Sequence, residues 1–129
     1  MSLSELSCRS ILIVDDDPDV RDAVASVLVD EGYGVTGVGS GREALQHLQD
    51  HMLPSLILLD MMMPGRSGSD VLRELRADPA TAATPVIMLT ARAQASDREA
   101  MNLAGANHYL TKPFSPVGLA ALVEDVLGT

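Results

Sequence analysis

The sequence predicts a single α/β domain built on a doubly wound parallel sheet of five strands with helices on both faces. Its length of 129 residues is that of one domain. Short apolar stretches alternate along the chain with longer stretches that have helical apolar spacing, and this order is typical of parallel α/β folds. Three of the short stretches, residues 11–14, 56–59 and 86–89, contain no polar residue, as expected for strands covered on both faces.

The first strand, residues 11–14, leads into a helix predicted over residues 18–31. Asp17 is a suitable N-cap, and Pro18 fits the first helical position because no hydrogen-bond partner is needed there. The apolar residues of this stretch fall on one side, and two glycines that follow it end the helix.

The remaining elements follow from the same signals. Further strands are predicted at residues 33–38, 56–60, 86–90 and 108–111, and further helices after the N-cap candidates Ser40, Ser67, Ser96 and Ser115. Ser40 with Glu43, and Ser96 with Glu99, have the spacing of a capping box. Gly105 is the predicted end of the helix that begins after Ser96.

The elements fill residues 10–129. Residues 1–9 are expected to form an N-terminal extension, which a cloning leader could explain in part. We expect no output domain, because the sequence ends directly after the last predicted helix.

Charge and composition argue against several classes of partner. The 18 acidic and nine basic residues give a formal net charge of −9, which repels nucleic acid and anionic lipid but suits a divalent cation or a basic protein surface. No apolar run approaches the ~20 residues of a membrane helix, and the N-terminus lacks the basic stretch of a secretory signal. A single cysteine, Cys8, permits no intrachain disulfide, which favours a reducing compartment and predicts a cytoplasmic location.

Polar side chains follow the predicted strands at their carboxyl ends, which is where the functional sites of open α/β sheets lie. The segment Asp15-Asp16-Asp17 follows the first strand, Asp60 ends the third, Thr90 ends the fourth, and Lys112 follows the fifth. We therefore expect carboxylates, a hydroxyl and the only lysine of the chain to converge on one edge. Crowded carboxylates repel one another unless a cation compensates, and hard oxygen ligands suit Mg²⁺.

Each of these features also has an ordinary explanation. An acidic run between a strand and a helix is usually a solvated turn, and one aspartate after a strand is usually a turn residue. The run Met61-Met62-Met63 is explained more simply by core and site-flanking positions than by a Met-rich binding surface. His47, His51 and His108 are expected on the surface or in the core rather than as metal ligands. Only the conjunction of several polar strand ends favours a functional site.

Four segments resemble the receiver domain of bacterial response regulators, the CheY-like family. They are residues 11–17 (ILIVDDD), 58–65 (LLDMMMPG), 86–91 (VIMLTA) and 105–114 (GANHYLTKPF), in the family's order along nearly the whole chain. The resemblance implies a flavodoxin-like (βα)5 fold and makes residues 10–129 a receiver domain. It also implies a phosphorylation-controlled switch in two-component, or phosphorelay, signal transduction.

The resemblance implies roles for the residues at the predicted edge. Asp60 corresponds to the phosphoacceptor. Asp16 and Asp60 correspond to direct Mg²⁺ ligands, with Mn²⁺ as an alternative ion, while Asp15 would act largely through water and the backbone carbonyl of Met62 would be a further ligand. Lys112 would pair with Asp60 at rest and with the phosphoryl oxygens afterwards, and the peptide bond after Lys112 would be cis.

Two further pairs of positions concern the response to phosphorylation. The resemblance implies that Thr90 bonds the phosphoryl group and that Tyr109, an exposed aromatic switch residue, then moves inward. The switching face would comprise the helix after Ser96, the strand at 108–111 and the last helix. Met62 and Arg92 would border the phosphoryl group, and because a methionine cannot orient water by hydrogen bonding, we expect a long-lived phosphorylated form.

The implied partners are a sensor histidine kinase or histidine phosphotransfer protein as donor and a downstream effector on the switching face. A phosphorylation-dependent dimer, a bacterial cytoplasmic location and no direct contact with nucleic acid or membrane are also expected. The chain would not be an enzyme beyond promoting its own phosphorylation and dephosphorylation. One alternative is a Mg²⁺-dependent phosphatase with an aspartate nucleophile, although Met62 stands where such enzymes have a second aspartate. The other is a degenerate receiver that only binds partners, although every expected site residue is present.

Overall fold

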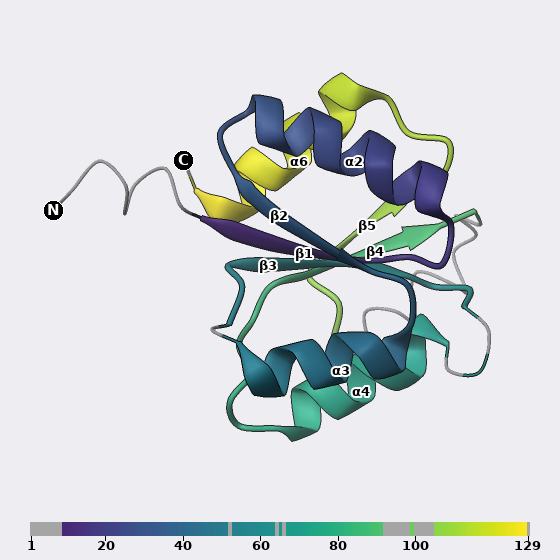
Figure 1. Ribbon diagram of the computed structural model, residues 1–129, viewed down its shortest axis with the longest axis vertical. Helices are drawn as coiled ribbons and strands as arrows, with labels where there is room; N and C mark the ends of the chain where they lie inside the picture. Colours follow the sequence, from purple (N-terminus) through teal and green to yellow (C-terminus); the bar gives the residue numbers. More distant parts are fainter. Residues whose placement is uncertain are drawn as a thin grey trace, which may run out of the picture.

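The structure is a computed structural model that describes residues 9–51, 53–63, 65, 67–91, 99 and 105–128. Five parallel strands form one sheet in the order β2-β1-β3-β4-β5 (Figure 1). The strands are β1 (Ser10–Val14), β2 (Gly34–Val38), β3 (Leu56–Asp60), β4 (Val86–Thr90) and β5 (His108–Thr111), and the helices are α2 (Pro18–Asp30), α3 (Gly41–Asp50), α4 (Gly68–Ala77) and α6 (Pro116–Leu127). The predicted parallel sheet is confirmed, whereas the helix predicted after Ser96 falls almost wholly outside the described residues.

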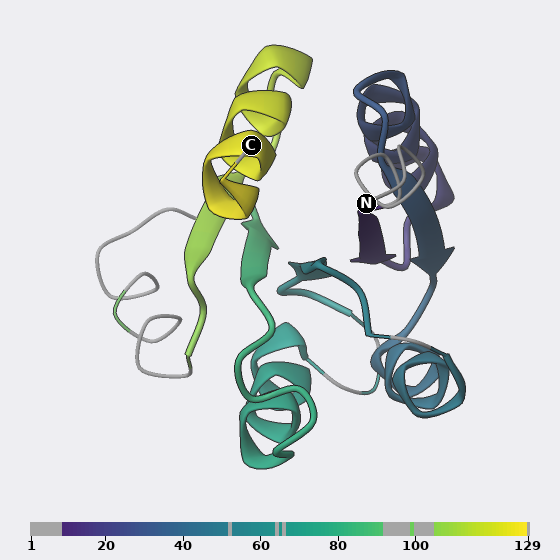
Figure 2. The same ribbon diagram turned by 90° about the vertical axis from the view of Figure 1, so that its left-hand side faces the viewer.

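The helices lie in two layers on opposite faces of the sheet (Figures 1 and 2). Ile11 and Ile13 of β1 pack with the buried residues of α2 and α6, while Leu12 and Val14 pack with those of α3 and α4. Because successive side chains of a strand point to opposite faces, both layers draw their core from the same strands. Two apolar faces therefore explain the uninterrupted apolar sequences of β1, β3 and β4.

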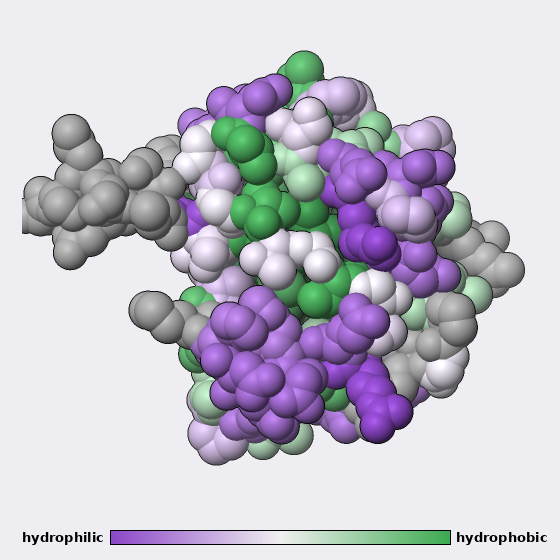
Figure 3. All heavy atoms as spheres, in the orientation of Figure 1, coloured by the Kyte–Doolittle hydropathy of each residue, from purple (hydrophilic) through white to green (hydrophobic). Residues whose placement is uncertain are grey.

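The edge strand β2 borders a more open surface. Figure 3 shows apolar residues gathered over this edge of the sheet, between hydrophilic parts of the two helical layers. Strand β2 begins at Gly34 rather than at Tyr33, because the Tyr33 N–H is used to close the preceding turn on the carbonyl of Leu28 at 3.1 Å. The preceding helix ends at Asp30, one residue before the predicted end.

The predicted N-caps Asp17, Ser40, Ser67 and Ser115 all accept a backbone N–H of the first helical turn. The capping box predicted at Ser40 is wrong in one half. Its Glu43 carboxylate reaches one residue further, to the N–H of Gly39 at 3.0 Å. A complete box forms instead at Ser67, where the shorter Asp70 returns to the N-cap N–H.

An arginine near the end of α4 ties together the amino ends of β4 and β5. The Arg76 guanidinium donates to four oxygens of the preceding loops, the carbonyls of Thr81, Thr84 and Gly105 and the side chain of Asn107. The same Asn107 oxygen accepts the N–H of Val86 at 2.9 Å. Burial lowers the pKa of Arg76 from its usual value. None of the helices in the described ranges combines the length and the apolar character needed to cross a membrane.

Candidate functional site

Three carboxylates meet at the carboxyl edge of the sheet. Strand β1 ends at Val14, which pairs with Leu59 of β3, so the next residues on both strands, Asp15 and Asp60, lie side by side. Asp15 is fully buried and Asp60 is 4% exposed, whereas Asp16 is exposed. One oxygen from each of the three carboxylates lies within 4.8 Å of the others. The expected convergence of the acidic strand ends is therefore present.

Lys112 supplies the positive charge of this cluster. Its Nζ donates to Asp15 Oδ2 at 2.9 Å and to Asp60 Oδ1 at 3.2 Å. The pair with Asp60 matches the expected resting contact, and the peptide bond between Lys112 and Pro113 is cis, as the resemblance implied. The shorter contact with Asp15 was not expected from the sequence, which left Asp15 only a water-mediated role towards a metal.

Burial and neighbouring charges decide how the cluster ionises. Burial and the charge of Asp15 raise the pKa of Asp60 above its usual value, and Lys112 offsets part of this rise. Burial disfavours the charged form of Lys112, but hydrogen bonds and charges from Asp15 and Asp60 raise its pKa overall. Lys112 therefore remains protonated near neutral pH, and one ammonium faces three carboxylates. Their hard oxygen atoms and excess negative charge fit a divalent cation such as Mg²⁺.

Thr90 and Tyr109 lie on neighbouring strands, β4 and β5, and face the α3 and α4 layer. Tyr109 is opposite Met88 in the register and packs against the core cluster that contains Met88. Thr90 is two residues beyond Met88, so it points to the same face, and it is 4% exposed. Tyr109 is half-buried rather than exposed, because its ring already covers part of that core.

The positions expected to control the lifetime of a phosphoryl group are only partly described. Met62 is 74% exposed, and its N–H points to Asp60 Oδ1 at 3.4 Å. Arg92 lies outside the described residues. Met61 and Met63 pack against the core, which supports the core and site-flanking interpretation of the methionine run.

Gly68 is a site residue that the sequence did not identify. A Cβ at this first position of α4 would lie 2.3 Å from the carbonyl oxygen of Asp60 and 2.9 Å from Cα of Met61. The Gly68 N–H also donates to the carbonyl of Met61 at 3.0 Å. Only glycine allows α4 to begin this close to the end of β3, and the available signal was a glycine directly after the N-cap Ser67.

Two histidines make a contact that the sequence analysis did not predict. The rings of His47 and His51 stack with centroids 4.2 Å apart and planes inclined by 16°. His47 lies in the last turn of α3 and His51 is its C-cap, and their four-residue spacing was the signal that could have paired them. They lie outside the acidic cluster.

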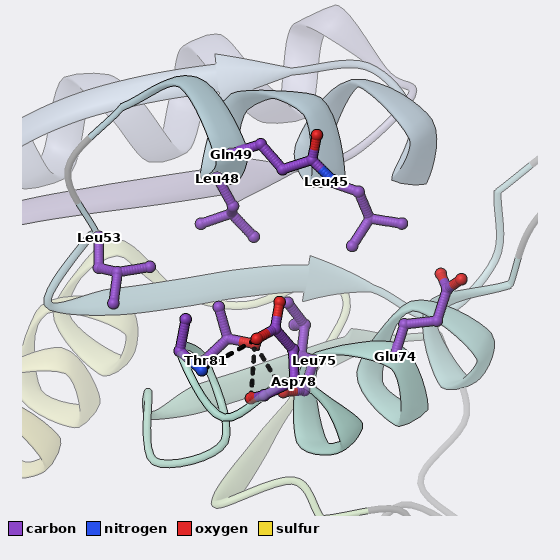
Figure 4. Close-up of a pocket in the computed structure, with 9 residues that line it drawn as sticks. Leu45, Leu48, Gln49, Leu53, Glu74, Leu75, Asp78 and Thr81 are labelled. Atoms are coloured by element: carbon purple, nitrogen blue, oxygen red, sulfur yellow. Dashed lines mark hydrogen bonds between the residues drawn. The ribbon is translucent and has the colours of Figure 1, made fainter.

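Two cavities lie at opposite edges of the sheet, and one of them borders the site. One of about 470 Å³ lies between the carboxyl-terminal ends of α3 and α4, lined by Leu48, Leu53 and Leu75 among others (Figure 4). Another of about 530 Å³ lies beside the acidic cluster, where Lys112 and Phe114 face Val20. Only the second cavity borders a residue of the site.

The chain is similar to response regulators in sequence and structure. The model of the response regulator receiver domain family matches residues 11–124. The DNA-binding response regulator MtrA of Mycolicibacterium smegmatis is 42% identical over 116 residues, covering 90% of this chain and 49% of MtrA. Response regulator Rre1 of Synechocystis is 40% identical over 119 residues, covering 92% of this chain and 51% of Rre1. The chain thus spans about half the length of these two relatives.

Solved structures of response regulators and receiver domains have a similar fold. Chemotaxis protein CheY4 of Vibrio cholerae has a TM-score of 0.87 and 31% identity, covering 92% of this chain and 98% of that chain. The receiver domain of a sensor histidine kinase from Pseudomonas aeruginosa, with magnesium coordinated in its active site cleft, has a TM-score of 0.84 and 34% identity, covering 94% and 98%. Together with the match over residues 11–124, these similarities show that the chain belongs to the response regulator receiver domain family.

Proposed function

We propose that Asp60 accepts a phosphoryl group from a phosphohistidine and that Asp15, Asp16, Asp60 and the carbonyl of Met62 hold the Mg²⁺ ion that the transfer needs. The observation that carries the proposal is the placement of Asp60, a buried carboxylate at a strand end, 3.2 Å from the Lys112 ammonium and within 4.8 Å of two further carboxylates.

The described contacts make the two oxygens of Asp60 different. Oδ1 is oriented by Lys112 at 3.2 Å and by the Met62 N–H at 3.4 Å. All the hydrogen bonds that Asp60 accepts from the described residues go to Oδ1, and we propose Oδ2 as the atom that bonds to phosphorus or to a metal. A bound Mg²⁺ would supply positive charge to the phosphoryl oxygens.

The transfer itself balances without another reactant. A carboxylate oxygen of Asp60 forms the new bond to phosphorus while the bond from phosphorus to the histidine nitrogen breaks, and the bonding electrons return to that nitrogen. The product is an acyl phosphate, and Lys112 can move its ammonium from the carboxylate to the new phosphoryl oxygens. The compact ammonium of a lysine, carried on a flexible four-carbon side chain, suits this exchange of anions.

The same proposal assigns the response to phosphorylation. Thr90 would donate its hydroxyl to a phosphoryl oxygen, and Tyr109, on the same face of the neighbouring strand, would move further into the space that Thr90 leaves. Met62, which is exposed and cannot orient water by hydrogen bonding, would give the acyl phosphate a long lifetime, with Arg92 as the second bordering residue.

The proposed partners follow from the position of the site. A histidine kinase or histidine phosphotransfer protein would dock beside the acidic cluster, where the cavity of about 530 Å³ is bordered by Lys112 and Phe114. A downstream effector or a second copy of the chain would bind to the surface around β5 and α6. We propose no nucleic-acid contact for this chain, although MtrA is a DNA-binding protein.

Small-molecule phosphorylation tests the assignment. Incubation with acetyl phosphate and Mg²⁺ is expected to add one phosphoryl mass that hydroxylamine removes. Asp60→Asn should abolish the modification, while Asp50→Asn, an exposed change at the end of α3, should not. Full labelling of the Asp60→Asn variant would sink the assignment, and labelling of neither protein would favour a receiver that only binds partners.

A further inference from the structure

We propose that Arg21 is a positioning residue for the cation site, because it holds the peptide group from which Asp16 projects. The inference rests on the proposed function of the acidic cluster as a Mg²⁺ site. Arg21 lies in the first turn of α2, and its Nη1 donates to the carbonyl oxygen of Asp15 at 2.7 Å. That carbonyl belongs to the peptide unit that joins Asp15 to Asp16, so the hydrogen bond fixes the plane of this unit.

The other groups of Asp15 are fixed by different partners. Its N–H donates to the carbonyl of Val38 at 3.1 Å, its Oδ1 accepts the N–H of Asp17 at 2.9 Å, and its Oδ2 accepts Lys112 at 2.9 Å. The Asp16 carboxylate, by contrast, is exposed and makes no hydrogen bond with any residue in the described ranges. The orientation of Asp16 therefore depends on its main chain. Arg21 holds the peptide unit before Asp16, and Asp15 Oδ1 holds the peptide unit after it through the Asp17 N–H.

Two glycines make room for the arginine side chain. A Cβ at Gly37 would lie 3.3 Å from Cδ of Arg21, and a Cβ at Gly39 would lie 3.2 Å from its Nη1. Neither glycine has a positive φ, so the backbone itself would accept another residue at both positions. The missing side chains therefore serve the path of Arg21 across the end of β2, towards Asp15.

Electrostatics alone would disfavour this arginine. A guanidinium in the first turn of a helix faces the positive end of the helix dipole. It also places a positive charge next to a site for another cation, which by Coulomb's law weakens cation binding. A positioning role and a purely electrostatic role therefore predict opposite effects when the charge is removed.

The test uses Mg²⁺ titrations by calorimetry on the full chain, at a temperature where every variant is folded. Arg21→Gln is expected to weaken Mg²⁺ binding about tenfold, the lower end of the loss seen when an outer partner of a metal ligand is removed. The matched control is Arg42→Gln, which removes an equal charge from an exposed residue at the start of α3 that has no side-chain hydrogen bond in the described part of the chain. This control should keep the wild-type affinity.

Two further measurements separate positioning from general stability. Gly37→Ala should weaken Mg²⁺ binding about twofold to threefold in the wild type, through its crowding of Arg21, and should have no further effect in Arg21→Gln. Without metal, the ¹⁵N shift of the Asp16 amide, which shares its peptide unit with the Asp15 carbonyl, should change in Arg21→Gln and stay constant in Arg42→Gln.

The outcomes distinguish this inference from the proposed function. A wild-type protein that binds no Mg²⁺ would overturn the proposed cation site. Normal wild-type binding together with equal or tighter binding by Arg21→Gln would overturn the positioning role alone. An Asp16 amide shift that does not respond to Arg21→Gln would also overturn the positioning role, whatever the metal titration shows.

Discussion

Asp60→Asn is expected to stabilise the metal-free protein by about 1–2 kcal/mol. The change removes the repulsion between Asp60 and Asp15, which is about 3.5 kcal/mol for oxygens up to 4.8 Å apart at an effective dielectric constant of ~20. It also removes the attraction to Lys112 at 3.2 Å, about 5 kcal/mol on the same basis. Lys112 keeps its shorter contact with Asp15, and the exposed Asp16 adds a repulsion that solvent screens, so the charge contributions cancel to within about 2 kcal/mol. The cost of burying an ionised carboxylate then decides the sign.

The pH dependence follows from the direction of the pKa shift. The pKa of Asp60 is raised above 3.8 in the folded protein, so the folded state binds this proton more tightly than the unfolded state does. The destabilisation by Asp60 is complete above its folded-state pKa and disappears as the pH falls through that value towards 3.8. The stability advantage of Asp60→Asn should therefore be constant near neutral pH and shrink on acidification.

Thermal and urea denaturation in the presence of a chelator measure this effect. An increase in Tm of roughly 3–8 °C is expected for a domain of this size. Asp22→Asn is the matched control, because it removes an equal charge from an exposed position of α2. A variant less stable than wild type, or a stability gain that persists unchanged at acid pH, would refute the reasoning.

Two other substitutions test the construction of the site. Lys112→Gln should destabilise the metal-free protein by about 2–3 kcal/mol, because buried Asp15 loses its counter-ion, while Arg73→Gln, which breaks an exposed ion pair, should cost no more than about 0.5 kcal/mol. Since the pKa of Lys112 is raised above 10.5, its contribution to the free energy of unfolding should be complete below pH 10.5 and disappear as the pH rises through the folded-state pKa. Urea denaturation at several pH values measures this dependence, and a contribution that falls below pH 10.5 would contradict it. Gly68→Ala should cost about 3 kcal/mol or more because its Cβ meets backbone atoms at the end of β3, whereas Gly34→Ala, with 3.9 Å to its nearest neighbour, should change the free energy of unfolding by less than about 1 kcal/mol. Equal effects of the two glycine changes in denaturant titrations would contradict the close approach.

The sheet was largely predictable because strands buried on both faces have continuous apolar sequences. The strands β1, β3 and β4 appear as continuous apolar runs, since alternate residues serve opposite layers of helices. The start of the edge strand β2 was not predictable, because the strand is only partly buried and begins after the hydrogen bond from Tyr33 that closes the preceding turn. Capping depended on side-chain length, which is why Glu43 bonded a different N–H from the one expected.

The meeting of the carboxylates was also predictable, because parallel topology brings the ends of neighbouring strands together. Which of the two Lys112 contacts is shorter was not predictable, because Lys112 reaches both Asp15 and Asp60 and the two distances differ by only a few tenths of an ångström. The close approaches at Gly68 and Gly37 were hidden for a related reason. Missing side chains do not reveal which distant atom occupies their space.

The guanidinium of Arg76 gives the two edges of the sheet different chemical sensitivities. Its acceptors are neutral oxygens of Thr81, Thr84, Gly105 and Asn107, and an arginine keeps its proton throughout the physiological pH range. The amino ends of β4 and β5 are therefore joined by a connection that neither acid, nor Mg²⁺, nor a phosphoryl group can remove. Under the proposed function, the carboxyl edge, with its aspartates and lysine, responds to all three. We expect amide hydrogen exchange at the amino ends of β4 and β5 to stay slow when the carboxyl edge changes state. The amino ends would then keep their structure while residues at the carboxyl edge move.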